Sequence, residues 1–147
     1  MSAARAPRLQ LLDYAALARF RLELRRFLTF SERTSHAVGL EPQQHQLLLA
    51  LRGFASPENP PTIRNIADWL LIQHHSAVEL VDRAVARGLV RRHQDAFDRR
   101  RVLVELTPEG EEVLAELSIQ HREELESTAP ALVAALGEVL DWHEPNR

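Results

Sequence analysis

The chain has 147 residues, enough for one domain with a sizeable core, and its 45% hydrophobic and 27% charged residues fit a globular protein, not a disordered one. It has no cysteine, which excludes disulfides and thiolate metal sites, and no apolar run near the roughly 18 residues that cross a bilayer. All 18 basic residues are arginine, and the net charge of -3 argues against indiscriminate nucleic-acid binding.

The charge is unevenly distributed along the chain. Residues 1–61 and residues 62–104 each have a net charge of +3, whereas residues 105–147 have a net charge of -9. A polyanion-binding face in the first two thirds is compatible with this distribution, which would steer its approach. The N-terminus has two arginines with no apolar core after them, so we expect no signal peptide and a cytoplasmic protein.

Residues 8–36 are expected to form a long helix that is apolar on two sides. The narrow stripe consists of Leu11, Ala15, Ala18 and Leu22. The bulkier stripe, on the other side, consists of Leu17, Phe20, Leu24, Phe27 and Leu28. Such a helix needs apolar partner surface on both of these sides. Burial of one side in a subunit interface is a natural solution.

Residues 42–71 contain two expected helices joined by a loop. Pro42 suits the first turn of a helix over residues 42–53, with Leu47, Leu48 and Leu51 as its core contacts. Residues 55–61 are expected to be a loop, because their prolines exclude both helix and strand pairing. A short helix then covers residues 62–71, with its apolar residues facing inward.

Residues 73–87 are the candidate recognition helix. At 100° per residue one side gathers Ala77, Leu80, Val81 and Ala84, and the other gathers His75, Ser76, Glu79, Asp82 and Arg83. Gly88 can adopt the left-handed conformation that ends a helix. Strands over residues 89–92 and 101–106 then form a hairpin whose tip is polar apart from Ala96 and Phe97. A hairpin that closes a helix-turn-helix is the winged variant of a DNA-reading motif.

Two further helices are expected after the hairpin. Thr107 is a good N-cap and Pro108 suits the first position of a helix that runs to residue 127. Thr128 and Pro130 give a similar start signal for a last helix over residues 130–142.

This order of elements resembles the MarR family of bacterial winged helix-turn-helix transcription regulators. The resemblance is carried by IADWL at 66–70, AVELVDRAVARGLV at 77–90, DRR at 98–100 and VLVELTPEG at 102–110. It implies a mainly α fold with a small β-hairpin wing, in which a winged helix-turn-helix over residues 42–107 is flanked by dimerisation helices in residues 1–40 and 108–147 of a single domain. It also implies a two-fold dimer on a near-palindromic operator, usually repression, and relief by a small anionic or phenolic ligand.

The candidate DNA contacts lie on the recognition helix and the hairpin tip. A helix in the major groove reads base edges, while a basic tip reaches the neighbouring minor groove and backbone. We predict contacts from Arg99 and Arg100, and the matching family motif implies that Asp98 orients one of them. On the recognition helix the predicted contacts are Gln73, His74, His75, Ser76, Glu79 and Arg83, the last of these to phosphate.

Glu79 leaves two interpretations open, because it directs a carboxylate toward a polyanion. It can accept a hydrogen bond from cytosine N4 and so read sequence. Alternatively, it pairs with Arg83, four residues further on, and stays off the DNA.

An effector site follows only from analogy with the family, whose ligand pocket lies between the dimer helices and the winged region. On that analogy an anionic ligand would meet Arg21, Arg25, His36 and His45. Some relatives bind zinc where His36, His45 and Glu41 lie here, so a metal-responsive regulator is an alternative. We predict no metal site, because the sequence shows no convergence of three ligands.

Catalytic motifs are missing: the sequence has no glycine-rich phosphate loop, nucleophile elbow or HExxH. We predict a protein that is not an enzyme and needs no cofactor, with operator DNA, a second copy of itself and a small effector as partners, and no membrane. The competing class is a winged-helix protein–protein interaction module without DNA binding, for which the acidic residues on the recognition helix argue.

Overall fold

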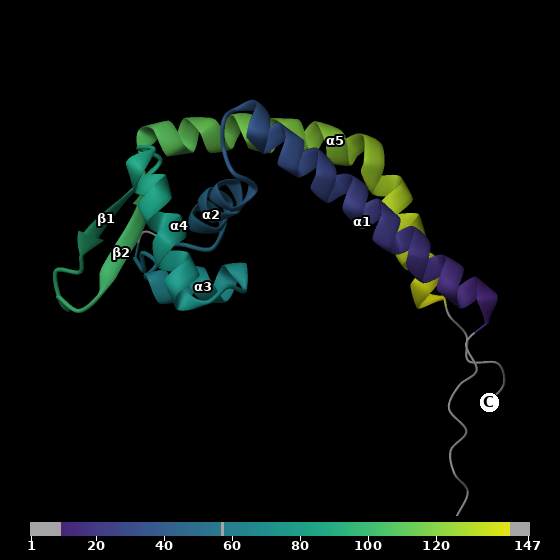
Figure 1. Ribbon diagram of the computed structural model, residues 1–147, viewed down its shortest axis with the longest axis horizontal. Coiled ribbons are helices and arrows are strands. Elements are labelled where there is room, and N and C mark those ends of the chain that lie inside the picture. The colour runs from purple at the N-terminus through teal and green to yellow at the C-terminus, as the bar shows by residue number, and fades with distance from the viewer. Residues whose placement is uncertain (1–9, 57, 142–147) are drawn as a thin grey trace, which may run out of the picture. The chain divides into compact units, whose positions relative to one another are not determined.

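The computed structural model describes residues 10–56 and 58–141 (Figure 1). In chain order the elements are α1 (Leu11–Ala37), α2 (Pro42–Gly53), α3 (Ile63–Leu70), α4 (His74–Ala86), β1 (Val90–Gln94), β2 (Val102–Leu106) and α5 (Pro108–Leu140). They form two compact units, a helical unit of residues up to Ser31 and from His121 onward, and a winged unit of residues 32–120. No helix among the described residues is long and apolar enough to span a membrane. The segment behind the signal-peptide prediction lies outside the described residues, except for Gln10.

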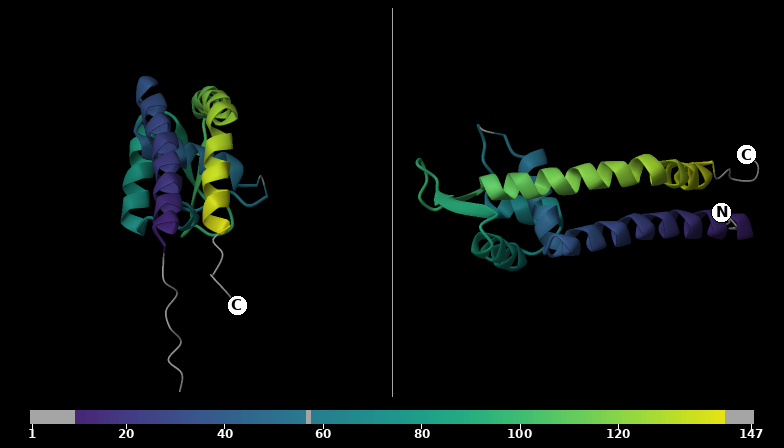
Figure 2. Two further views of the ribbon diagram at one scale, coloured as in Figure 1. Left: turned by 90° about the vertical axis from the view of Figure 1, so that its right-hand side faces the viewer. Right: turned by 90° about the horizontal axis from the view of Figure 1, so that it is seen from above.

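In the helical unit, the first part of α1 and the last part of α5 run side by side in opposite directions (Figure 2). Near one end Arg19 Nη2 lies 2.6 Å from Glu138 Oε2. Near the other, His121 Nε2 and Ser31 Oγ share a hydrogen bond of 2.8 Å. The predicted long first helix is confirmed over Leu11–Ala37.

Aromatic residues of α1 surround His121 of α5. The rings of Phe27 and Phe30 meet the imidazole edge-on, with centroids 6.1 and 5.4 Å away. Phe20 and Leu24, from the bulkier stripe of α1, are half-buried as well. Part of the bulkier stripe is therefore covered within one copy of the chain, whereas Leu22 of the narrow stripe stays exposed.

The predicted start of a separate last helix is wrong. α5 continues from Pro108 to Leu140 with Pro130 inside it. Thr128 does not cap a new helix, because its Oγ1 donates back to the Glu124 carbonyl, 2.9 Å away, within the same helix. Pro130 cannot donate to the carbonyl four residues earlier, which removes one helical hydrogen bond. The helix beyond Pro130 buries Ala135 and reaches α1 through the ion pair of Glu138 with Arg19, so it continues despite the local start signal.

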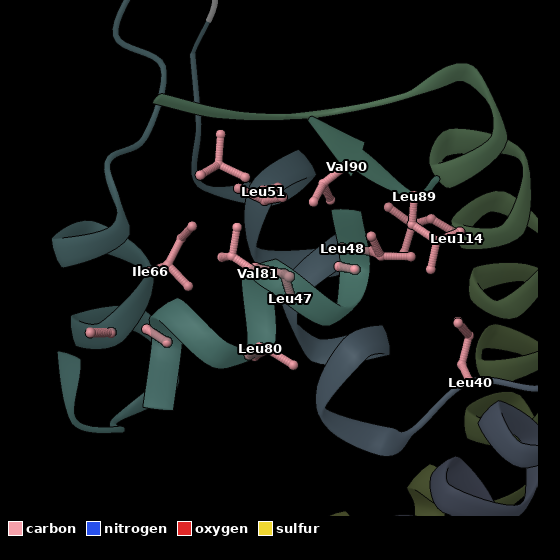
Figure 3. Packing of buried hydrophobic residues seen from close by; sticks show 14 of the residues in the cluster. Leu40, Leu47, Leu48, Leu51, Ile66, Leu80, Val81, Leu89, Val90 and Leu114 are labelled. Atoms are coloured by element: carbon pink, nitrogen blue, oxygen red, sulfur yellow. The ribbon is translucent and has the colours of Figure 1, made fainter. Parts of the chain in front are cut away.

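The core of the winged unit lies between α2, α3 and α4 and extends to the hairpin and the start of α5 (Figure 3). Leu47, Leu48 and Leu51, the predicted core contacts of α2, are at most 4% exposed. The predicted inner face of α4 is also confirmed, since its four residues are fully buried: Ala77, Leu80, Val81 and Ala84. Each large side chain buried here contributes about 1.5–3 kcal/mol. The rotation of α4 about its axis is therefore fixed by its packing.

A tight turn joins α3 to α4. α3 begins at a capping box in which Thr62 Oγ1 accepts the Asn65 N–H over 3.2 Å and Asn65 Oδ1 accepts the Thr62 N–H over 3.0 Å. It ends at Leu71, whose backbone is left-handed (φ 55°, ψ 41°), and the Ile72 N–H donates to the Ala67 carbonyl over 3.1 Å. Glycine usually occupies this position of a helix-ending turn. The turn that orients α4 relative to α3 therefore requires a strained, left-handed backbone at Leu71.

Leu71→Gly is expected to raise the free energy of unfolding by about 0.5–1 kcal/mol, because glycine adopts the left-handed conformation without a steric penalty. The greater freedom of glycine in the unfolded chain reduces the gain. Little burial is lost, since Leu71 is 91% exposed. Urea denaturation at one protein concentration measures the change. Leu71→Ala removes the same side chain but keeps the strain, so an equal gain from alanine would contradict this explanation.

The hairpin pairs β1 with β2 in antiparallel register, with Val90 opposite Leu106. Both predicted strands are confirmed, and the first runs two residues further than expected, which shortens the tip to residues 95–101. Leu103 and Val104, on opposite faces of β2, are both buried. The Val104 N–H donates to the Pro61 carbonyl over 3.0 Å, so the loop before α3 joins the edge of the hairpin. This third segment explains why β2 has a buried apolar residue on both of its faces.

Candidate nucleic-acid interface

α4 presents a polar face opposite its buried one. Gln73, His74, His75, Glu79 and Arg83 on this face are exposed, and Ser76 is half-buried. Because the core fixes the rotation of the helix, this face is presented without reordering. A single helix of this kind fits the width of a B-DNA major groove.

The amino end of α4 is suited to an anion. Gln73 is the N-cap residue, with extended backbone angles (φ -72°, ψ 154°), but its side chain makes no capping hydrogen bond. The first N–H groups of the helix therefore carry the positive end of the helix dipole without a cap from Gln73. A phosphate oxygen of a nucleic-acid backbone is a matching acceptor.

Arg83 does not pair with Glu79, so the helical pairing considered from the sequence is wrong. Arg83 Nε instead lies 3.3 Å from Glu41 Oε2, at the start of α2. One turn further along α4, Arg87 Nη1 donates to the Gly39 carbonyl over 2.7 Å. These two contacts tie α4 to the turn between α1 and α2, which the four-residue spacing could not reveal. Arg83 is therefore held in an ion pair, and Glu79 remains exposed on the polar face.

The tip of the hairpin is shaped by aspartates that accept backbone hydrogen bonds. Asp98 Oδ1 accepts the N–H of Arg100 over 3.0 Å, so Asp98 orients the backbone of this arginine rather than its guanidinium. Asp95 Oδ1 accepts the N–H of Phe97 over 3.0 Å in the same way. The side chains of Arg99 and Arg100 are exposed. The tip thus presents both arginines on an ordered turn.

Ion pairs connect the hairpin to α4 and brace it internally. Arg92 Nη2 on β1 lies 2.6 Å from Asp82 Oδ1 on α4. Across the hairpin, Arg91 Nε lies 2.6 Å from Glu105 Oε1. Asp82 was predicted to lie on the outer side of α4, and it is exposed there while bonded to the wing. The recognition helix and the wing are therefore linked through side chains as well as through the chain.

A hollow of about 560 Å³ lies between the start of α3, the start of α4 and the hairpin. Its lining residues are Thr62, Ile63, Arg64, Asn65, His74, Arg100, Arg101 and Val102. Three arginines and one histidine from separate stretches of the chain thus meet around one concave surface, and none of the eight residues is acidic. Such a surface suits a phosphodiester backbone, which carries one negative charge per nucleotide.

The sequence did not identify Arg64 and Arg101 as candidate nucleic-acid contacts. The inward-facing Ile63 and Ile66 placed Arg64 on the outside of its helix, but nothing in the sequence brought it near Arg100. The whole of α4 and the first strand separate the two in the chain. Arg101 was counted as the first residue of a strand, whereas it ends the tip and lies 3.7 Å from Asp95.

The residues named for a ligand are divided between the two units. Arg21 and Arg25 are exposed on α1 in the helical unit. His36 is exposed and His45 is buried in the winged unit. Glu41, considered with these histidines as a metal ligand, pairs with Arg83. Within residues 10–56 and 58–141 no cluster of three or more metal-ligating side chains occurs.

Comparisons with known proteins agree on the fold. Residues 38–101 match the family model described as "MarR family", and no curated protein matches the chain. Among solved structures, AbsC, a MarR family transcriptional regulator from Streptomyces coelicolor, is 19% identical with a TM-score of 0.74, covering 91% of this chain and 93% of that one.

Two further solved structures are similar. MepR, a transcription regulator of the Staphylococcus aureus multidrug efflux pump MepA, is 20% identical with a TM-score of 0.69 over 80% of this chain and 82% of its own. A mutant MarR from E. coli, complexed with operator DNA, is 21% identical with a TM-score of 0.66 over 90% and 96% of the two chains. The predicted mainly α, winged helix-turn-helix fold is confirmed.

Proposed function

We propose that this chain is a MarR-type transcription regulator that binds operator DNA as a two-fold dimer and represses, since residues 38–101 match the MarR family model. The main support for the proposal is the hollow of the winged unit, where Arg64, Arg100 and Arg101 meet His74 of α4. The polar face of α4 and the exposed tip arginines adjoin this hollow. The MarR-type structure from E. coli that is complexed with operator DNA supports it.

The proposed docking assigns a separate task to each part of this surface. The outer face of α4 lies in the major groove, where His75, Ser76 and Glu79 reach base edges. The phosphate backbone crosses the hollow beside Arg64, and it positions the protein without reading sequence. Arg99 and Arg100 at the tip reach the next minor groove and the phosphates beside it. Because Glu79 is not paired with Arg83, its carboxylate is available to accept from cytosine N4.

A second copy of the chain is proposed to cover the apolar surface of the helical unit. The large apolar side chains that stay exposed there are Leu11, Leu12, Tyr14, Leu17, Leu22, Leu28, Val133, Leu136 and Leu140. A monomer of this size does not normally expose so many on two paired helices. An isologous two-fold contact through residues 1–40 and 108–147 would bury them and repeat the winged unit for two half-sites.

We further propose that a small-molecule effector relieves repression. A small anionic or phenolic ligand would act by binding better to one spacing of the two recognition helices than to the other. Arg21, Arg25, His36 and His45 remain its proposed contacts. The protein would act in the cytoplasm, without a cofactor and without catalysis.

Steep salt dependence of DNA binding is the expected result that tests this function. Arg64, Arg99 and Arg100 from two protomers give six phosphate-proximal cations. The slope of log affinity against log salt should therefore be about -5, at roughly 0.9 per contact. Fluorescence anisotropy with fragments of the DNA upstream of its own coding sequence measures it, with an unrelated duplex of equal length as control.

An absence of binding at low salt by a folded dimer would contradict the proposal. It would favour the alternative of a winged-helix protein–protein interaction module. Equal affinity for both duplexes would overturn operator recognition and leave only general DNA binding.

A further inference from the structure

Phe97 stands at the apex of the hairpin with its side chain entirely outside the protein. It is 99% exposed, more than any other large apolar residue in the described part of the chain. Isolated exposed apolar residues are common on protein surfaces and need no function. Phe97 differs from such residues because it lies between the two turns that shape the tip and beside the tip arginines.

The tip holds the backbone around Phe97 in place. The Phe97 N–H donates to Asp95 Oδ1, and the Asp95 N–H donates to the Arg101 carbonyl, each over 3.0 Å. On the other side, Asp98 accepts the N–H of Arg100 at its side chain and the N–H of Arg101 at its carbonyl, again over 3.0 Å. An ordered backbone presents the ring with little further loss of conformational entropy on binding.

The surroundings of the ring match the chemistry of a minor-groove wedge. Arg99 and Arg100 follow Phe97 by two and three residues, and both are exposed. Minor-groove proteins combine such cations, which follow the phosphates and the groove, with apolar side chains inserted between base steps. Asp95 lies 3.7 Å from Arg101, which offsets its charge next to the ring. The ring is thus carried on an arginine-rich tip toward a polyanion.

We infer that Phe97 is an apolar wedge that inserts at a base step of the minor groove and bends the operator. This inference rests on the proposed DNA binding and adds to it a residue that acts through shape rather than charge. Partial unstacking of one step costs a few kcal/mol, which the bent duplex offsets by contacting more protein surface. Two tips per dimer would place one wedge at each end of the operator.

The test compares affinity, salt slope and DNA bending for wild type, Phe97→Ala and Phe97→Leu on the same upstream fragment. Anisotropy over a salt series gives the first two, and energy transfer between end-labelled DNA gives the bend. Phe97→Ala should lose about tenfold in affinity and most of the bend, with an unchanged salt slope because no charge is removed. Phe97→Leu, which keeps an apolar wedge, should retain most of both.

Phe54→Ala is the matched control. It makes the same substitution at a ring that is 66% exposed and packs against Trp69 of α3. It should leave affinity and bend unchanged. The wedge is overturned if Phe97→Ala binds and bends DNA as wild type does, or if it changes the salt slope as loss of a cation would. Failure of the wild-type protein to bind the fragment overturns the proposed function and the wedge together.

Discussion

Gly110→Ala is expected to lower the free energy of unfolding by about 3 kcal/mol, a large loss for so small a change. A Cβ at this position would lie 2.0 Å from the carbonyl oxygen of Leu89 and 3.0 Å from its carbonyl carbon. Both are backbone atoms, so no side chain can rotate away to make room. Relief requires the start of α5 to move away from the chain that leads into β1.

The contacts around Gly110 resist that movement. Leu89 is buried in the core, and its carbonyl accepts the Thr107 N–H over 3.1 Å. Thr107 Oγ1 donates to the Gly88 carbonyl over 2.5 Å and accepts the Gly110 N–H over 3.1 Å. The first turn of α5 and the root of the hairpin therefore form one hydrogen-bonded joint. Displacing it loses several bonds together, and the wing would shift relative to α4.

Gly53→Ala is the matched control, since a Cβ there meets nothing within 4 Å and the residue ends α2. Alanine at that position should be neutral or stabilise by up to about 1 kcal/mol. Thermal and urea unfolding at equal protein concentration measure both variants, because the stability of the proposed dimer would depend on concentration. Equal stability of Gly110→Ala and wild type would show that α5 can shift without cost and contradict the joint.

Local patterns in the sequence were enough to predict the elements of the winged unit. Apolar spacing identified the buried face of α4, and the four residues it selected are all fully buried. Gly88, expected to end that helix, is left-handed with φ 71°. Thr107 and Pro108 marked the start of α5 correctly. These signals act within one or two turns of helix, and no distant residue opposes them.

Predictions failed where a distant residue decided the outcome. The start signal at Thr128 was overridden because α5 continues along α1. Arg83 pairs with Glu41 and not with Glu79, one turn away, because the fold brings the start of α2 against α4. The site shows the same limit: the tip arginines could be read from the motif, whereas Arg64 joins them only through packing. Pairing of such residues depends on tertiary structure, which spacing along the chain does not encode.

Arg64→Ala and Arg100→Ala are each expected to weaken operator binding about tenfold, and together about 100-fold. Both side chains line the hollow. Each substitution should make the slope of log affinity against log salt less negative by about 2, because one phosphate contact is lost per protomer. Arg52→Ala serves as the charge-matched control. Arg52 lies on α2, 4.0 Å from Glu111, and does not line the hollow, so its loss should change neither affinity nor slope.

The two variants separate the parts of the proposed interface. Arg100 lies at the hairpin tip and also lines the hollow, so its effect tests the wing and the hollow together, whereas Arg64 lies on α3 and its effect tests the hollow alone. If Arg100→Ala weakens binding and Arg64→Ala does not, the backbone of the duplex does not cross the hollow and the proposed docking is wrong there. If both weaken binding with reduced slopes while Arg52→Ala does not, one strand of phosphates runs from α3 to the hairpin. That path places the outer face of α4 in the adjoining major groove, because the hollow and the start of α4 share His74.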